Sequence, residues 1–260
     1  MYKKTFMLFF CFMLAVSGCA TRPTDPEELK IYEETNDPLE PMNRGIHAFN
    51  QTADKYVLKP IAQGYRAVVP SFFRDMISNF FQNLSQPVHF VNALLQGQGK
   101  DAGAVLGRFA VNSTFGFFGV FDVATDAGIP NPANDFGQTL AKWGWDGDGG
   151  PFIMLPILGP SNVRDGIGTG VDMAAHPLGW ALWNEQELRY GMVAVDGIST
   201  REKALDLTDD LQKSSTDYYA TLRSMSRQNR KKKINAVMTE KEPDEKPDYE
   251  ADFSDIEWED

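Results

Sequence analysis

Apolar residues recur at helical spacing through most of the chain between residues 38 and 238. The first apolar stripe follows steps of three and four residues and consists of Met42, Ile46, Phe49, Ala53 and Tyr56. This spacing predicts an amphipathic helix. Asp37 and Pro38 precede it and resemble a helix start, with Asp37 as the N-cap, Pro38 at the first position and Glu40 reaching back. Pro60 is expected to end this helix.

A second stripe is expected to begin behind Ser71, which would cap the helix. Its apolar positions are Phe72, Phe73, Met76, Ile77, Phe80, Phe81 and Leu84. Its polar positions are Arg74, Asp75, Ser78, Asn79, Gln82 and Asn83. Such a phenylalanine stripe suits either a protein core or a helix lying in a membrane interface, and the sequence leaves both interpretations open. Shorter stripes at 88–95 and 105–110 predict a third and a fourth helix.

The middle of the chain lacks a clear period. Residues 115–121 are apolar and contain two glycines, and residues 129–160 are crowded with glycine and proline. A segment of this length in a compact domain is usually functional or disordered, and its aromatic residues favour an ordered one. We expect one short strand near 152–155, a helix capped by Ser161 and ending at Ala175, and two more helices beginning near Leu188 and Tyr218. The predicted fold class is all-α, with a long irregular loop rich in glycine and proline.

The first residues predict export. Lys3 and Lys4 precede about 12 apolar residues, too few to span roughly 30 Å of hydrocarbon, so a signal peptide is expected rather than a membrane span. The segment ends in Ser17-Gly18-Cys19, which resembles the lipobox of bacterial lipoproteins and implies a diacylglycerol on Cys19. An ordinary signal peptide with a chance cysteine is the alternative. In lipoproteins Asp after the cysteine commonly implies retention at the inner membrane; Ala20 here points to the outer one.

These patterns divide the chain into a signal peptide (1–18), a lipidated flexible tether (19–37), a helical domain (38–238) and an acidic disordered tail (239–260). Cys11 would leave with the signal peptide and Cys19 would be acylated, so no disulfide or thiolate metal site is expected. The formal net charge of −11 would become −13 once the two lysines of the signal peptide are removed. An acidic protein of this kind is a poor candidate for nucleic-acid binding.

Motifs for catalysis are scarce. The three histidines, His47, His89 and His176, form no metal-binding pair, and neither a nucleophile elbow nor a phosphate-binding loop occurs. Asp146, Gly147 and Asp148 imitate the start of a calcium loop, but Gly150 stands where a ligand is needed and no Glu follows at the right distance. We therefore expect no enzyme activity, no metal and no cofactor. A lipid hydrolase with a dispersed triad and a purely structural lipoprotein stay open as alternatives.

Several motifs together resemble the MlaA (VacJ) lipoprotein family. They are residues 37–44 (DPLEPMNR), 79–84 (NFFQNL), 108–114 (RFAVNST), 135–140 (DFGQTL), 143–144 (WG), 150–152 (GPF), 155–156 (LP) and 159–165 (GPSNVRD). The resemblance covers nearly everything from residue 37 to the last basic helix, in the family's order. Asn134, Ala141 and Phe152 depart from residues that are frequent in the family.

The resemblance implies a ring of amphipathic helices seated in the periplasmic leaflet of the outer membrane and often bound to a trimeric porin. A central channel would pass misplaced phospholipids from the outer leaflet to a soluble periplasmic carrier and so maintain lipid asymmetry. The candidate residues for the channel and its loop are Asn112, Asp135, Gly137, Gly144, Gly150, Pro151, Arg164 and Asp165.

Three segments carry open alternatives. Residues 144–150 could form a gating hairpin or an ordinary exposed loop. Arg164 and Asp165 could form a structural pair or contact a lipid head group. The last helix ends in basic residues, which could be a solvated face or could meet anionic head groups or an acidic carrier. Its candidate partner-binding residues are Tyr218, Arg223, Arg227 and Arg230.

Overall fold

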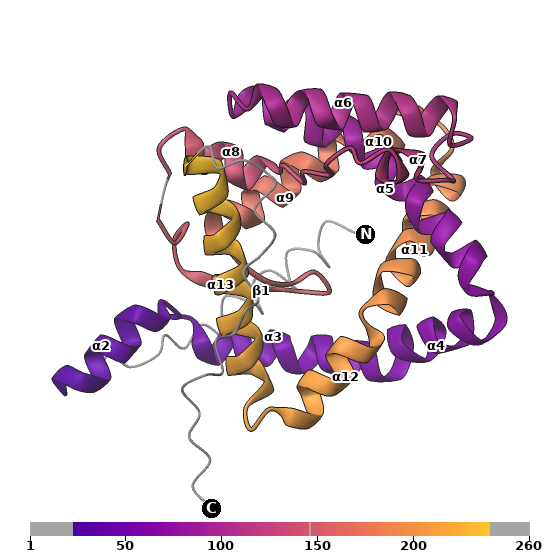
Figure 1. Cartoon of the computed structure of the whole chain (residues 1–260). Coiled ribbons are helices and arrows are strands. Elements are labelled where there is room, and N and C mark those ends of the chain that lie inside the picture. Colours follow the sequence, from indigo (N-terminus) through magenta and orange to yellow (C-terminus); the bar gives the residue numbers. More distant parts are fainter. Residues whose placement is uncertain (1–22, 146, 240–260) are drawn as a thin grey trace, which may run out of the picture.

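The computed structural model describes residues 23–145 and 147–239 (Figure 1). Its helices are α2 Pro26–Thr35, α3 Glu40–Ala53, the π-helical turn η1 Asp54–Leu58, α4 Lys59–Val68, α5 Ser71–Leu95, α6 Gly99–Thr114, α7 Val123–Asp126, α8 Phe136–Lys142, α9 Val163–Ala175, α10 Pro177–Ala181, α11 Gln186–Lys203, α12 Leu205–Ser214 and α13 Tyr218–Thr239. Strands β1 Phe152–Leu155 and β2 Gly159–Asn162 pair antiparallel. The predicted signal peptide, the lipid anchor Cys19 and residues 240–260 of the predicted tail lie outside the described residues.

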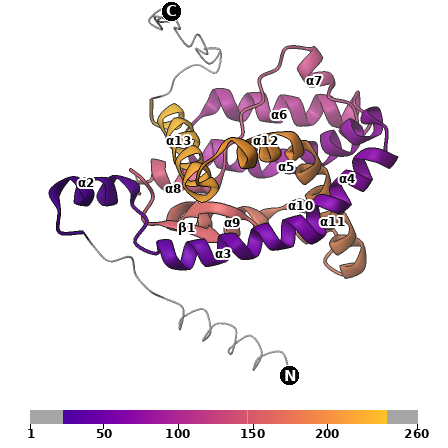
Figure 2. The same ribbon diagram turned by 90° about the horizontal axis from the view of Figure 1, so that it is seen from below.

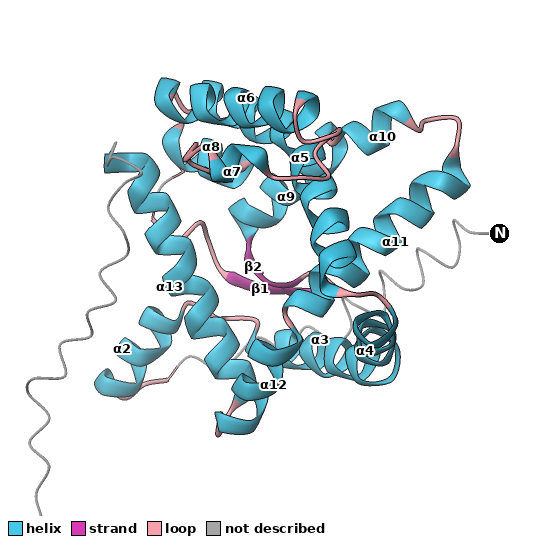
Figure 3. Cartoon of the chain, turned by 45° about the vertical axis from the view of Figure 1, so that its right-hand side comes forward, coloured by secondary structure: helices cyan, strands magenta, loops and turns pink. Residues whose placement is uncertain are grey.

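The helices follow one another around a central space, into which the β1–β2 hairpin extends (Figures 1 and 3). Helix α5 packs along α6, α8 against α9, and α11 against α4. Figure 2 shows α2 projecting from the helical body beyond α3. The predicted mostly helical class is confirmed. A channel through the central space stays a prediction.

The first helix runs further than expected, because Pro60 does not end it. Helix α3 continues through η1 into α4, and Pro60 lies in the first turn of α4. The wider π-helical turn directly before the proline accommodates a residue that lacks a backbone N–H. Asp37 is not the N-cap either, since α3 begins at Glu40 and Leu39 occupies the cap position without a side-chain hydrogen bond.

Helix α5 joins the predicted second and third helices into one of 25 residues, with Pro87 inside it. Two predicted caps were wrong. Ser71 makes no capping bond, and α9 is capped by Asn162 rather than Ser161, its side-chain oxygen accepting from the Asp165 N–H at 2.8 Å. Asparagine and serine are both good N-cap residues, so the sequence alone does not decide between Ser161 and Asn162.

Several elements were missed, among them β2, α2 and α8, the last of which lies inside the stretch 129–160 that was predicted to be irregular. Strand β2 has the sequence Gly-Pro-Ser-Asn, residue types depleted in strands, and it exists because β1 lies beside it. Helix α2 lies within the segment predicted as a tether, and it begins at Pro26, a residue whose fixed φ suits the first turn of a helix. The strand predicted at 152–155 is confirmed as β1. No described helix is both long enough and apolar enough to cross a membrane.

Candidate functional site

Polar side chains occupy much of the interior of this protein. The described residues include 16 buried polar or charged residues and 15 buried hydrophobic ones, five of the latter being alanine. On α5 the buried positions include Ser78, Asn83, Gln86 and Asn92. An ordinary water-soluble domain buries mainly large apolar side chains, so this interior is unusual.

Large apolar side chains are exposed instead. Phe72 and Phe73, at the start of α5, are more than half exposed, whereas Phe81 further along the same stripe is buried. Trp180 in α10 and Trp183 in the segment between α10 and α11 are also exposed. Exposed tryptophans are typical of surfaces at a membrane interface. The stripe on α5 is thus buried at Phe81 and exposed at Phe72 and Phe73.

A further group of exposed apolar side chains lies in the loop between α6 and α7. Phe117 and Phe118 are 69% and 71% exposed and both have positive φ, +52° and +60°. Gly119 follows at φ +87°, where a Cβ would lie 2.3 Å from the Cβ of Asn83. Only glycine fits at position 119, because any side chain there would collide with Asn83. This close contact holds the loop so that the two phenylalanines stay exposed.

Asn112, predicted as a channel residue, supports this phenylalanine loop. Its Nδ2 donates to Asp122 Oδ1 at 2.9 Å, and its Oδ1 accepts from the Ala124 N–H at 2.8 Å. Asp122 also pairs with the buried guanidinium of Arg108 at 2.7 Å. Burial would raise the pKa of Asp122, but its hydrogen bonds and Arg108 hold that pKa below its ordinary value.

A cavity of about 770 Å³, here called the central cavity, lies among α3, η1, the hairpin and α11–α13. Its polar wall includes two ion pairs, Lys59 with Asp209 and Arg201 with Asp54, each 2.6 Å long. Its apolar lining residues include Leu58, Met154, Ile157 and Leu222. The central cavity is therefore lined by both classes of side chain, as a route for an amphiphile requires.

Tyr218, predicted to bind a partner, lines the central cavity, with its ring centroid 5.5 Å from that of His47. Burial, with a smaller contribution from Arg44, lowers the pKa of His47 and favours its neutral form. The neighbouring Tyr219 is buried and donates its hydroxyl hydrogen to Asp37. Asp37 also pairs with Arg223 at 2.7 Å, so that arginine fastens α13 to the segment before α3.

Arg230 of α13 joins two of the predicted channel residues. It donates to both oxygens of Asp135 at 2.6 and 2.7 Å and lies 2.7 Å from Asp165. Burial would raise the pKa of Asp135, but the hydrogen bonds and charge of Arg230 outweigh burial and lower that pKa. A Cβ on Gly137 would lie 2.5 Å from Nη2 of Arg230, so glycine at 137 permits this three-residue clamp.

Arg164 organises the glycine loop. Its side chain is 1% exposed and donates to the carbonyl oxygens of Trp145 at 2.9 Å and Gly147 at 3.2 Å. Gly144 and Gly150 adopt positive φ of +111° and +91°, which a β-carbon would disfavour. Pro151 is exposed directly before β1. Arg164 and Asp165 are paired at 3.0 Å, as the structural interpretation predicted, and gating by the loop stays a prediction.

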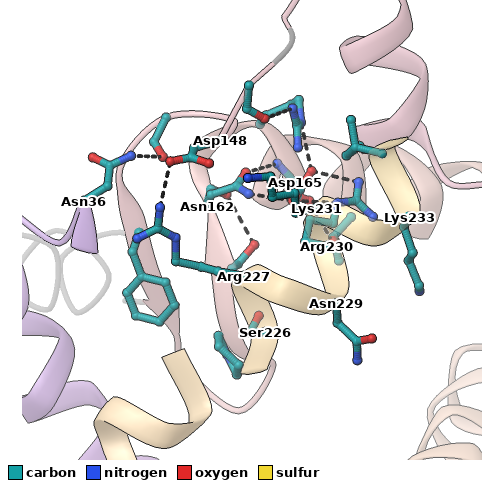
Figure 4. Close-up of a pocket in the computed structure, with 18 residues that line it drawn as sticks. Asn36, Asp148, Asn162, Asp165, Ser226, Arg227, Asn229, Arg230, Lys231 and Lys233 are labelled. Atoms are coloured by element: carbon teal, nitrogen blue, oxygen red, sulfur yellow. Dashed lines mark hydrogen bonds and ion pairs between the residues drawn. The ribbon is translucent and has the colours of Figure 1, made fainter. Parts of the chain in front are cut away.

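A second cavity of about 280 Å³ lies between the glycine loop, β2 and α13 (Figure 4), and is called the basic pocket below. Arg164, Arg227, Arg230, Lys231 and Lys233 line it, with Asp148 and Asp165 as its acidic residues. Arg227 pairs with Asp148 at 2.7 Å. Sequence reasoning had named the arginines separately, and the structure brings them to one place.

The side chains that clamp α13 were not all predictable. Asp37 and Tyr219 meet across 182 positions, and Asn36 donates to the carbonyl of Gly150 in the glycine loop, 114 positions away; no local pattern marks such contacts. Among the described residues, no group of three histidine, cysteine, aspartate or glutamate side chains could hold a metal ion.

The comparisons with known proteins agree with one another. The family model for "MlaA lipoprotein" matches residues 35–233. The intermembrane phospholipid transport system lipoprotein MlaA of Haemophilus influenzae is 34% identical over 246 residues, covering 90% of this chain and 92% of that protein. The protein of the same name from Escherichia coli K12 is 34% identical over 213 residues, or 79% of each chain. An uncharacterised protein of Rickettsia felis is 35% identical over 192 residues, 74% of this chain and 75% of the other.

A solved structure described as "Structural basis for maintenance of bacterial outer membrane lipid asymmetry" superimposes with a TM-score of 0.66 at 35% sequence identity. The match covers 76% of this chain and 99% of that one. A family model matching most of the chain, relatives above 30% identity and a shared fold lead to one conclusion: the chain belongs to the MlaA lipoprotein family.

Proposed function

We propose that this chain is an outer-membrane lipoprotein, anchored through Cys19 on the periplasmic face, that forms a passive phospholipid conduit. It takes mislocalised phospholipids from the outer leaflet and passes them to a soluble periplasmic carrier. The observation that carries this proposal is the inverted burial: polar residues inside, phenylalanine and tryptophan outside. The names of its curated relatives and of the similar structure support the same role.

The energetics of lipid movement explain why such a protein is needed. A phospholipid has roughly 30 methylenes, each worth about 0.8 kcal/mol when it leaves water, so unassisted escape from a bilayer would cost tens of kcal/mol. A conduit lowers that cost by shielding the tails along the route. The central cavity offers apolar residues such as Met154 and Leu222 for the tails, beside a polar wall that includes Asp54 and Arg201.

Neighbours in the membrane complete the proposal. The exposed side chains of Phe72, Phe73, Trp180 and Trp183 suit contact with acyl chains and with an apolar porin wall. The exposed lysines near the end of α13 suit anionic lipid or an acidic carrier. A trimeric porin and a periplasmic carrier are thus the proposed partners, and no step of the transfer requires covalent chemistry.

Filling the central cavity tests the conduit. Gln212→Trp places a large side chain in the cavity lining, whereas Lys213→Trp places the same side chain on the adjacent exposed position outside it. In a Gram-negative strain lacking its own family member, the wild-type chain and Lys213→Trp should restore low outer-leaflet phospholipid. Gln212→Trp should leave it raised at equal protein level.

Other outcomes would favour the alternatives. Normal outer-leaflet phospholipid in the strain without any copy would favour a structural scaffold. Fatty-acid release by the purified protein would favour a lipid hydrolase. Full activity of Gln212→Trp with the indole shown inside the cavity would contradict passage through it.

A further inference from the structure

The basic pocket stands out in an acidic protein. Its five cationic lining residues and two acidic ones give a formal charge of +3, or +2 when Asp135, which pairs with Arg230 from outside the lining, is counted. The whole chain carries −11. A concave site with excess positive charge and a volume of about 280 Å³ has the size and sign for one phosphate-bearing head group.

The cations divide into two groups. Arg164, Arg227 and Arg230 already donate to backbone carbonyls or carboxylates, and Figure 4 shows Arg227 and Arg230 at the pocket. Lys231 and Lys233 are exposed, and neither has an ion-pair partner among the described residues. These two ammonium groups can therefore meet an anion without breaking an existing pair.

The basic pocket adjoins the central cavity along α13 and the hairpin. Both are lined by Pro160, while Leu222 lines the central cavity and Ser226 begins the lining of the basic pocket. Residues 218, 222, 226, 229 and 233 follow steps of four, four, three and four, so they share one face of the helix. That face changes along its length from tyrosine and leucine to serine, asparagine and lysine.

The length of this gradient matches a lipid. Eleven residues separate Leu222 from Lys233, about 16 Å along an α-helix. Half of a bilayer core of roughly 30 Å is about 15 Å, the depth that the acyl chains of one leaflet occupy. A free phosphate ion would need only the basic end, whereas a phospholipid uses the whole face.

We propose that the basic pocket binds the phosphate of a transported phospholipid while its acyl chains lie in the central cavity along α13. This inference rests on the proposed conduit and assigns its head-group site. The ammonium groups of Lys231 and Lys233 attract the phosphate. The three arginines, held by their own partners, maintain the shape of the pocket.

Native mass spectrometry of the full-length lipoprotein in a non-ionic detergent counts bound molecules directly. We would titrate it with dihexanoyl phosphatidylglycerol and, separately, with inorganic phosphate. Each lysine near a bound anionic lipid contributes roughly fivefold to its affinity, so Lys231→Gln/Lys233→Gln should bind the lipid about twentyfold more weakly. Lys231→Arg/Lys233→Arg should restore binding. Lys232 lies between these two lysines in sequence but does not line the pocket, so Lys232→Gln should bind the lipid with an affinity within about twofold of wild type.

The outcomes separate the hypotheses. Lipid binding that is unchanged in the double glutamine variant would overturn the head-group site and leave the conduit standing. Inorganic phosphate binding as tightly as the lipid would overturn the assignment to a phospholipid. No lipid adduct on the wild-type protein would contradict the conduit itself.

Discussion

Removing the cation that joins α8, α9 and α13 should destabilise the fold in a pH-dependent manner. Arg230 is 17% exposed and makes contacts of 2.6–2.8 Å with Asp135 and Asp165. Arg230→Met leaves Asp135 without its cation and removes one of the two cations of Asp165, which keeps its 3.0 Å contact with Arg164. Breaking a buried pair costs about 3–5 kcal/mol, and the partial exposure here reduces that to about 2–3 kcal/mol. For a chain of this size the melting temperature should fall by roughly 5–10 °C.

The pH dependence has a definite sign. Arg230 holds the folded-state pKa of Asp135 below its ordinary value, so this carboxylate stabilises the fold above the unfolded pKa of about 3.9. That stabilisation is lost as the pH falls through the lower folded value. In Arg230→Met this lowering is lost, so the pKa of Asp135 should rise relative to the wild type. The stability difference between variant and wild type should therefore be largest near pH 7 and shrink below about pH 4.

Urea unfolding in detergent, followed by circular dichroism at pH 7 and pH 3.5, measures both effects. Arg227→Met is the matched control, because its partner Asp148 is 54% exposed and a surface pair contributes about 0–1 kcal/mol. Equal stability losses for the two variants at pH 7, or a loss in Arg230→Met that does not change with pH, would refute the role assigned to the Arg230 clamp.

Two further predictions address packing and the membrane surface. In Gly168→Ala the new Cβ would lie 2.4 Å from the backbone nitrogen of Gly137, so α9 should be displaced from α8. The free energy of unfolding should fall by about 1–3 kcal/mol. Thermal unfolding measures this loss, with Gly170→Ala as the control because its new Cβ meets open space. The second test uses anchor-free protein carrying Cys19→Ser. Adding Phe117→Ser and Phe118→Ser should lower its affinity for liposomes in flotation assays at least tenfold, because burying each phenylalanine in lipid is worth about 1.5–3 kcal/mol. Unchanged flotation, with Thr114→Ala as control, would show that this loop does not enter the bilayer.

Local features of the fold were predictable because they depend on residues close in sequence. The helical period located α5, α6 and α13, and the glycine-rich stretch located the loop before β1. Helix ends were less predictable. Pro60 and Pro87 are accommodated within longer helices by their surroundings, and Asp37 is drawn from its expected capping role to Tyr219 and Arg223.

Which way each stripe faces could not be predicted. A phenylalanine stripe has the same spacing whether it faces a core or lipid, so Phe72 and Phe81 look alike in sequence although one is exposed and the other buried. The arginines of the basic pocket were likewise visible one by one. Their convergence with Arg164 depends on contacts between segments more than 60 residues apart.

The proposed conduit requires phospholipid to travel through the interior of this helical structure rather than only around it. Photo-crosslinking in cells tests this directly, with benzoylphenylalanine at Leu222 in the central cavity and at Phe72 on the outer surface. We predict phospholipid adducts at both positions, and loss of the Leu222 adduct alone in Gln212→Trp. Adducts at Phe72 with none at Leu222 would contradict the conduit.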